Sequence, residues 1–418
     1  MTALGCVQPR DTPDASSAPD TWRLVLNDLE GPLLSAWEAP TGELYAVGGR
    51  EGAPLVLRHD SRGWWRMDPG TPHALWWVFG FSSTHVYAVG ERGVVTYFGG
   101  QSWQVVRDGD DEALWGVWGE SPSALWSVGG DLSSGAAEGV VLRSMVGGRF
   151  VRVGSVPGLI FKVWGRSTND VTVVGDRGFI AHLRDGGFES EASGTTERLV
   201  TITGADGARF VVGGLNEGVV LSDAAGTWNA LTPPAPVPGL SGVATKADQL
   251  IISGQRGYLA ERSGAKWTQE TPLTDATLHA VVATSSGFVA VGGHLDQPDG
   301  RGVLLASHPL EAGSLQPWPF AGRARFDAGV DAGAVSIVDA GIARLELGAF
   351  CDRGAGVCSS GTNCWYVAAA ERSVCTISCR TVNDCAAFGP RACCELPGSQ
   401  TTTFTCLPPG VAGCDGGA

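Results

Sequence analysis

Arginine at a recurring glycine turn is the clearest candidate for chemistry in the sequence. Three turns read Gly-Glu-Arg-Gly, Gly-Asp-Arg-Gly and Gly-Gln-Arg-Gly, and they place Arg92, Arg177 and Arg256 at one equivalent position. Arg50 follows a Gly-Gly pair in a similar place. A guanidinium presents paired N–H donors that match a carboxylate or sulfate, so several on one surface would bind an anionic ligand. A glycine turn also favours a soluble residue at its tip, and this simpler explanation stays open.

These turns belong to a repeating unit that predicts the fold. An apolar strand ending in glycine recurs as LYAVGG, VYAVGE, LWSVGG, VTVVGD, FVVGGL, LIISGQ and FVAVGG, with a period of roughly forty residues. Four short strands fit into each period, and a small sheet that is apolar on both faces must pack against similar sheets. The sequence therefore predicts an all-β protein, a seven-bladed β-propeller with four antiparallel strands per blade. The anchor glycines of the seven units are Gly48, Gly90, Gly129, Gly175, Gly213, Gly254 and Gly292.

Closure of the ring can be predicted from the seventh unit. It has a third strand at 302–308 but no obvious fourth strand, whereas TWRLVL at 21–26 has the missing pattern. We expect this N-terminal strand to pair into the last blade and remove the open edge. The alternative is QPWPF at 316–320, whose prolines make it a poor ladder strand. Tryptophan is expected to fill the wedge between blades, and glycine to let the innermost strands crowd together.

Composition divides the chain into four predicted segments. Residues 1–20 form a polar tether, 21–312 the propeller, 313–348 a linker with three Asp-Ala-Gly repeats, and 349–418 a cysteine-rich module. The absence of a Cys-x2-Cys pair disfavours zinc, and the density of cysteine predicts disulfides formed outside the cytosol. The cysteines assigned to this module are Cys351, Cys358, Cys364, Cys375, Cys379, Cys385, Cys393, Cys394, Cys406 and Cys414.

The remaining cysteine, Cys6, lies in the sequence ALGC. This stretch resembles the box that precedes the lipidated cysteine of bacterial lipoproteins, and the resemblance implies a lipid anchor. Only five residues precede Cys6, so we expect a longer precursor that supplies the apolar core of a signal peptide. The alternative is a free thiol in a polar tail.

Three repeat units carry a family resemblance. AVGERGVVTYFGGQSW (88–103), VVGDRGFIAHLRDGGF (173–188) and SGQRGYLAERSGAKW (253–267) resemble photosystem II stability and assembly factors and the related BNR-type, WD40- and YVTN-like propeller repeats. The resemblance extends over residues 21–308 and implies an arginine-lined face for a partner. The whole organisation is similar to that of myxobacterial envelope lipoproteins of unassigned function. It implies a secreted or outer-membrane lipoprotein.

Charge and motifs narrow the function. A net charge of −14 without a basic run excludes a nucleic-acid binder, and no run of eighteen apolar residues could span a bilayer, so the membrane is reached only through the lipid. We find no motif for a cofactor or metal and predict neither. The leading prediction is a monomeric, non-catalytic binding or scaffold protein of the bacterial cell envelope, which recognises an envelope or extracellular protein or an anionic glycan. The alternative is a glycan-active enzyme of sialidase-like type, suggested by SDAAGTW (222–228), an incomplete match to an aspartate box.

Overall fold

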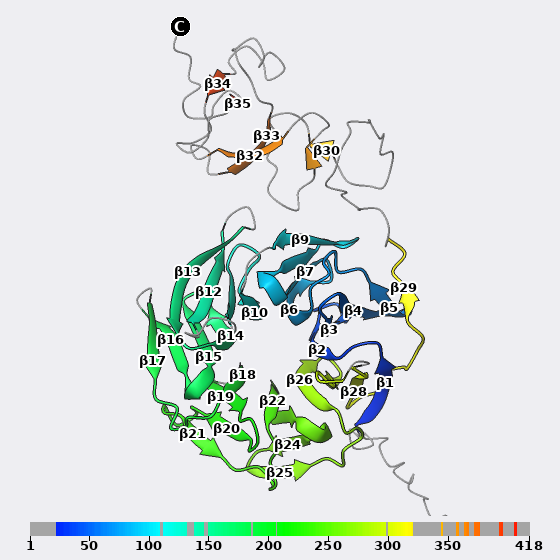
Figure 1. Ribbon diagram of the computed structural model, residues 1–418, viewed down its shortest axis with the longest axis vertical. Coiled ribbons are helices and arrows are strands. Elements are labelled where there is room, and N and C mark those ends of the chain that lie inside the picture. The colour runs from blue at the N-terminus through cyan, green and yellow to red at the C-terminus, as the bar shows by residue number, and fades with distance from the viewer. Residues whose placement is uncertain are drawn as a thin grey trace, which may run out of the picture. The chain divides into compact units, whose positions relative to one another are not determined.

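The computed structural model describes residues 22–320 except 109–111, 132–137, 146–148, 185–186, 206 and 298–299, together with the backbone of six short strands between 344 and 407. Within 22–320 the chain forms seven sheets arranged in a ring around a central axis (Figure 1). No helix of the described residues is long and apolar enough to cross a membrane. The ring of seven sheets confirms the predicted seven-bladed, all-β propeller.

The first three blades follow the chain in order, each with its first strand innermost. Blade 1 contains β2 (Leu33–Glu38), β3 (Leu44–Arg50), β4 (Ala53–Asp60) and β5 (Gly63–Met67). Blade 2 contains β6 (Leu75–Ser82), β7 (His85–Gly90), β8 (Val95–Phe98) and β9 (Trp103–Arg107). Blade 3 contains β10 (Ala113–Gly119), β11 (Leu125–Gly130), β12 (Glu138–Ser144) and β13 (Phe150–Pro157).

The remaining blades continue the same order. Blade 4 contains β14 (Ile160–Ser167), β15 (Asp170–Gly175), β16 (Ile180–Arg184) and β17 (Gly187–Glu191). Blade 5 contains β18 (Leu199–Ala205), β19 (Ala208–Gly213), β20 (Val219–Ser222) and β21 (Asn229–Leu231). Blade 6 contains β22 (Leu240–Lys246), β23 (Gln249–Gly254), β24 (Leu259–Ser263) and β25 (Lys266–Gln269). Blade 7 contains β26 (Thr277–Thr284), β27 (Gly287–Gly293) and β28 (Gly302–Ala306).

The N-terminal strand closes the ring, as the sequence predicts. β1 (Arg23–Leu29) pairs antiparallel with β28 and becomes the fourth strand of blade 7, with Arg23 opposite Ala306 and Leu29 opposite Gly302. In Figure 1 the blue N-terminal strand lies beside the yellow-green strands of the last blade. Ends that are far apart in sequence are therefore joined by a shared sheet, which leaves no unpaired edge at the closure.

The alternative closing segment has a different place in the fold. β29 (Gln316–Pro317) pairs parallel with β5 as a fifth strand of blade 1. Trp318 is buried there, and its Nε1–H donates a hydrogen bond of 2.6 Å to the Gln101 carbonyl. Residues 316–318, which the sequence assigns to the linker, thus lie along blade 1.

Beyond residue 320 only short strands are described, namely β30 (Arg344–Leu345), β31 (Val357–Cys358), β32 (Asn363–Val367), β33 (Arg372–Thr376), β34 (Cys393–Glu395) and β35 (Thr405–Leu407). Backbone pairing places Cys364 opposite Cys375 and Cys394 opposite Cys406. The ten predicted disulfide cysteines, the linker from 321 onwards, the tether and Cys6 lie outside the residues whose side chains are described. They remain predictions.

Packing between neighbouring blades relies on tryptophan against glycine. Trp37, Trp118 and Trp164, each on a first strand, lie against a glycine on the first strand of the next blade. A Cβ atom on Gly80, Gly165 or Gly204 would come within 2.7, 2.7 and 2.4 Å of those rings, respectively. The indoles therefore fill the space between blades, and the glycines allow the close approach that the sequence predicts.

Gly204→Ala tests this contact. We expect the added methyl group to clash with Trp164 and to lower the free energy of unfolding by about 1–3 kcal/mol, as overpacking does. Urea unfolding measures the change, and Trp164→Leu in the same background should recover part of it. Gly187→Ala is the control, because nothing lies within 4 Å of a Cβ there. Equal effects of the two alanine substitutions would contradict the packing account.

Candidate functional site

The first strand of every blade carries a β-bulge at the same place. In β6 the register shifts between Leu75 and Trp77, which leaves Trp76 as the additional residue, and an equivalent shift occurs in the other six blades. A bulge bends the strand and redirects the side chain of the extra residue. The seven bulge residues are Leu34, Trp76, Trp115, Phe161, Val200, Ser241 and His279.

The anchor glycine of each repeat makes room for this bulge. A Cβ on Gly90 would lie 2.0 Å from the carbonyl oxygen of Ala74, the residue before β6. The other six anchor glycines face the chain entering their own first strand equally closely, at 1.9 to 2.3 Å from a carbonyl oxygen. Only glycine lacks the atom that would collide, so the repeated glycine of the sequence accounts for the repeated bulge.

All seven bulge residues line one cavity of about 400 Å³, which we call the axial cavity. The next residue along three of the first strands, Trp77, Lys162 and Thr201, also contributes to its wall. Leu215 and Leu295 line it too, and these residues are 58% and 49% exposed, so they mark its rim. A cavity of this size with an apolar wall and a few polar groups has the usual features of a ligand site.

One side of the axial cavity is aromatic. The rings of Trp115 and Phe161 lie 5.3 Å apart, and the Arg198 guanidinium stacks 5.0 Å from the Phe161 centroid. Arg198 also forms an ion pair of 3.3 Å with Asp176. Trp76 donates its indole N–H to Glu91 at 2.7 Å, which fixes the ring at the cavity wall. Blades 2 to 4 thus present a rigid aromatic surface with a cation beside it.

The opposite side is polar and contains Ser241 and His279. The His279 ring nitrogen Nε2 lies 3.2 Å from the Gly293 carbonyl, to which it donates a hydrogen bond. Burial lowers the pKa of His279 to about 4, and this effect exceeds that of the hydrogen bond, so the ring is neutral at neutral pH. It therefore adds a hydrogen-bonding group to the cavity without adding charge.

Lys162, Trp77 and Thr201 line both the axial cavity and a second cavity of about 240 Å³. These three residues therefore lie between the two cavities, and we call this place the inner end of the axial cavity. The Lys162 Nζ donates a hydrogen bond of 2.8 Å to the Trp115 carbonyl and lies 3.4 Å from the centroid of the Trp77 ring. Burial lowers the pKa of the Lys162 ammonium well below its usual range. Among the described residues that line the axial cavity, none is an aspartate or glutamate.

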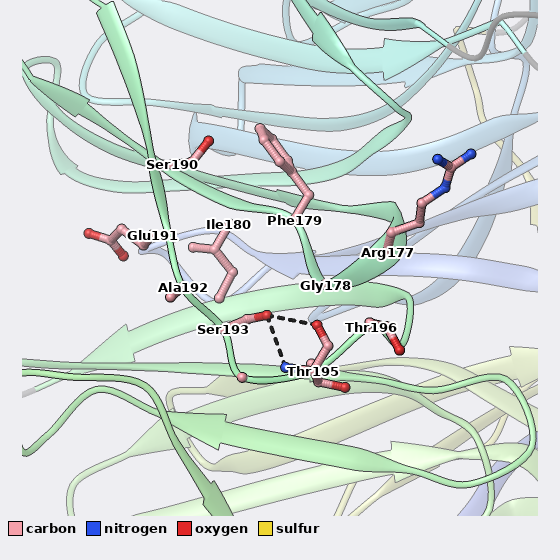
Figure 2. Close-up of a pocket in the computed structure, with 11 residues that line it drawn as sticks. Arg177, Gly178, Phe179, Ile180, Ser190, Glu191, Ala192, Ser193, Thr195 and Thr196 are labelled. Atoms are coloured by element: carbon pink, nitrogen blue, oxygen red, sulfur yellow. Dashed lines mark hydrogen bonds between the residues drawn. The ribbon is translucent and has the colours of Figure 1, made fainter.

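The four arginines predicted from sequence do not all line the same one of these hollows. Arg50 and Arg92 line a hollow of about 370 Å³ with Glu51 and Glu91. This hollow adjoins the axial cavity, since Leu34, Trp76 and Leu295 line both. Arg177 lines a separate hollow of about 680 Å³, where its guanidinium points away from the hydrogen-bonded Ser193 and Thr195 (Figure 2). Arg256 lines none of these.

Three of these arginines share an unusual backbone conformation. Arg92, Arg177 and Arg256 have φ values of 53°, 52° and 56° in the short 3-10 turns η1 (Glu91–Gly93), η2 (Asp176–Gly178) and η3 (Gln255–Gly257). Arg50 instead ends β3, and its guanidinium donates a hydrogen bond to the Gln297 carbonyl. Arg50 therefore matches the other three arginines in its sequence position but not in its backbone conformation.

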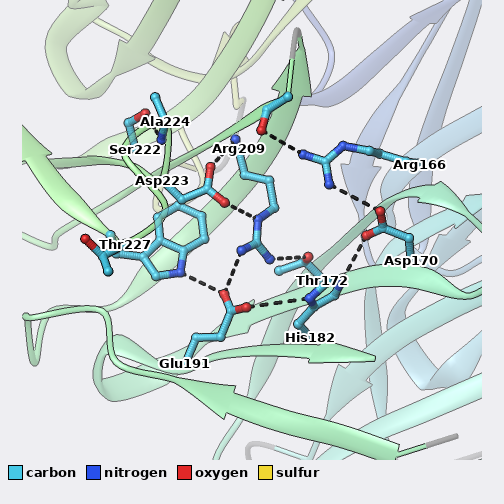
Figure 3. Close-up of polar contacts among 12 residues, drawn as sticks. Arg166, Asp170, Thr172, His182, Glu191, Arg209, Ser222, Asp223, Ala224 and Thr227 are labelled. Atoms are coloured by element: carbon cyan, nitrogen blue, oxygen red, sulfur yellow. Dashed lines mark hydrogen bonds and ion pairs between the residues drawn. The ribbon is translucent and has the colours of Figure 1, made fainter. Parts of the chain in front are cut away.

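The segment resembling an aspartate box has a packing role. Arg209 donates to Asp223 at 2.6 Å and to Glu191 at 2.8 Å, and Trp228 of the same segment donates its indole N–H to Glu191 at 2.8 Å (Figure 3). Thr172 accepts a further bond of 2.8 Å from Arg209, which ties blade 4 to blade 5. These groups satisfy one another between two blades and do not face the axial cavity.

Comparison with known proteins finds solved propellers that resemble this chain in fold. No family model matches the chain, and no curated protein matches it in sequence. A structure described as YCF48 bound to D1 peptide is 16% identical, with a TM-score of 0.54, over 71% of this chain and 99% of that one. YCF48 from Cyanidioschyzon merolae is also 16% identical, with a TM-score of 0.53, over 69% and 99% of the two chains. The WD40 propeller of Doa1 is 12% identical, with a TM-score of 0.53, over 68% and 96%. The chain is thus a propeller with distant structural similarity to YCF48 and to WD40 propellers.

Arg209→Met tests the packing role of the network between blades 4 and 5. We expect a loss of about 3–5 kcal/mol in the free energy of unfolding, because two partly buried carboxylates lose their shared cation. Arg184→Met is the control: its side chain is 54% exposed and pairs with the same Glu191 at 3.5 Å, so we expect a loss below about 1 kcal/mol. Chemical denaturation of both variants gives the comparison, and equal losses would refute a special role for Arg209.

Arg256→Gly tests the strain at the arginine turns. A left-handed conformation costs a residue with a Cβ about 1–2 kcal/mol, whereas the added chain entropy of glycine costs about 0.5–1 kcal/mol. We therefore expect the variant to unfold at the same or a slightly higher urea concentration. Arg262→Gly, in the regular strand β24, should instead lose about 0.5–1 kcal/mol. A greater loss at position 256 than at 262 would show that the Arg256 side chain stabilises the fold.

Proposed function

We propose that the protein is a non-catalytic binding protein whose propeller holds a segment of a partner protein in the axial cavity. The observation that carries this proposal is the convergence of all seven bulge side chains on one cavity with an exposed leucine rim. Exposed apolar side chains beside a formed cavity are typical of a surface that another molecule covers. The propeller of YCF48, similar in fold, has been solved with a D1 peptide bound, which supports a polypeptide as the occupant.

The glycan-active alternative requires different residues. A sialidase-like site uses a tyrosine nucleophile with carboxylates close to it. The axial cavity has no tyrosine, aspartate or glutamate among its described lining residues. Tyr45 and Tyr258 lie elsewhere and donate their hydroxyl groups to the carbonyls of Ser83 and Pro234 at 2.7 and 3.2 Å. The composition of the cavity therefore favours binding over catalysis.

The place of action is a further part of the proposal. We propose an extracytoplasmic, lipid-anchored protein of a bacterial envelope, on the basis of the ALGC stretch at Cys6 and the density of cysteine after residue 350. The proposed partner is accordingly an envelope or extracellular protein, and an anionic glycan is the other ligand class that the charge of the cavity would accept. Radiolabelled palmitate incorporated into the protein when it is expressed behind a bacterial lipoprotein signal peptide, and lost in Cys6→Ser, would support the anchor.

Paired substitution of Leu215 and Leu295 by serine tests the docking surface. Peptides selected from a random library on the wild-type propeller should contain aromatic or aliphatic residues. They should bind the double variant at least tenfold more weakly, because each buried leucine contributes about 1.5–3 kcal/mol. Leu273→Ser is the control, since Leu273 is an exposed leucine that does not line the axial cavity. Affinities from fluorescence anisotropy that are equal for wild type and double variant would refute the proposed site.

A further inference from the structure

Lys162 is unlike the other buried cations of this propeller. Arg209 contacts two carboxylates, Arg107 pairs with Glu112 at 3.0 Å, and Arg58 lies 3.6 Å from Glu43. The Lys162 side chain is as deeply buried, with the residue only 6% exposed, yet its described contacts are a carbonyl oxygen and an aromatic ring. A buried amine without a counterion is costly, and such sites are usually retained for a purpose other than stability.

The surrounding strands direct Lys162 into the axial cavity. It lies on β14 one residue after the bulge, and the equivalent position on the neighbouring β10 is Gly116. A Cβ on Gly116 would lie 3.1 Å from the Lys162 Cα, so glycine leaves the space through which the lysine passes towards Trp77 on β6. The amine therefore lies at the inner end of a cavity whose aromatic wall belongs to the same three blades, at the point where the second cavity begins.

We propose that Lys162 is the anchor for a carboxylate of the bound segment, which enters the cavity acid first and leaves an apolar side chain against Trp76, Trp115 and Phe161. The inference rests on the proposed function and specifies the chemistry of its ligand. A carboxylate would supply the counterion that the described residues do not, and it could come from a chain terminus or from an acidic side chain. Arg198, which pairs with Asp176 at 3.3 Å, places a second cationic group at the aromatic side of the cavity.

Proton uptake should accompany this binding. In the empty cavity burial lowers the pKa of Lys162, whereas a bound carboxylate would raise it, so one proton is taken from solvent when the pH lies between the two values. Affinity for a ligand whose carboxyl group is ionised is then constant below the pKa of the empty form, falls as the pH rises above it, and levels off above the pKa of the bound form. The other titratable groups lining the axial cavity are Arg198, already paired with Asp176, and His279, whose pKa is about 4; the second cavity adds none among its described residues.

Three peptides built around one sequence identify the chemistry. The first is N-acetyl-Ala-Ala-Trp with a free carboxylate, the second its C-terminal amide, and the third an amide with aspartate next to tryptophan. We expect wild type to bind an acid at least tenfold more tightly than the plain amide. A preference for the first peptide assigns the carboxylate to a chain terminus, and a preference for the third assigns it to a side chain. Equal affinity for all three would overturn the inference.

Lys162→Met should bind the acids and the amide equally, because methionine fills a similar volume without the charge. Lys246→Met is the matched control; Lys246 donates to the Ser285 carbonyl outside the axial cavity, so this variant should keep the wild-type preference. A preference that survives in Lys162→Met would overturn the inference.

Calorimetry on the wild type gives a test that needs no variant. Titrations at a series of pH values, each in two buffers of different ionisation enthalpy, should report an uptake that approaches one proton per acid peptide at its maximum. An acid peptide that binds with no uptake at any pH above the pKa of its own carboxyl group would also overturn the inference. In either negative case, binding that still weakens in the Leu215, Leu295 double variant would leave the proposed function intact, whereas binding insensitive to both sets of variants would refute both.

Discussion

The close approach of the chain to a glycine at the start of each blade is the constraint on which the rest of the propeller depends. The residue entering each first strand places its carbonyl where a Cβ on the anchor glycine would be, as Ala74 does opposite Gly90. Because the strands meet so closely there, the ladder does not continue in register beyond Leu75, and Trp76 is left as the bulge residue. The glycine therefore determines both the repeat that is visible in the sequence and the side chains that reach the axis.

Much of the fold follows from the sequence, because its signals are local and repeated. The period, the number of blades and the closing role of the N-terminal strand all depend on apolar alternation and glycine, which one chain displays seven times. The axial cavity could not be predicted in this way. The register shift between Leu75 and Trp77 depends on how two strands pair in space. Residues 76 and 77 are both tryptophan, so their type does not tell which of them is the bulge residue and which pairs with the next strand. The available signal was the variation among residues that follow the first leucine or isoleucine of each unit, from Trp76 to Ser241.

The arginine turns show that equivalent positions in a repeat share a backbone geometry but not their surroundings. Arg92, Arg177 and Arg256 occupy the same strained turn, so the repeat does predict their common geometry. Their surroundings differ because each turn borders a different blade, and only Arg92 adjoins the cavity wall through Trp76. The residue before each arginine contributes more directly to the axial cavity. Glu91 accepts a hydrogen bond from Trp76, and Asp176 forms an ion pair with Arg198. Gln255 lines the axial cavity itself. A repeat specifies a scaffold, and a site arises where the repeats differ.

The differences among the bulge residues also make the cavity chemically asymmetric around its axis. Seven equivalent side chains would present the same surface to a ligand in seven rotational positions. Here Trp76, Trp115 and Phe161 lie together on blades 2 to 4, whereas Ser241 and His279 lie on blades 6 and 7. A ligand bound there as we propose would have a single rotational position, with its apolar part towards the aromatic side chains and its polar edge towards the histidine. Lys162 adds polarity along the axis, since it projects from the aromatic side into the inner end of the cavity. One ligand in one orientation is the binding mode that this asymmetry favours.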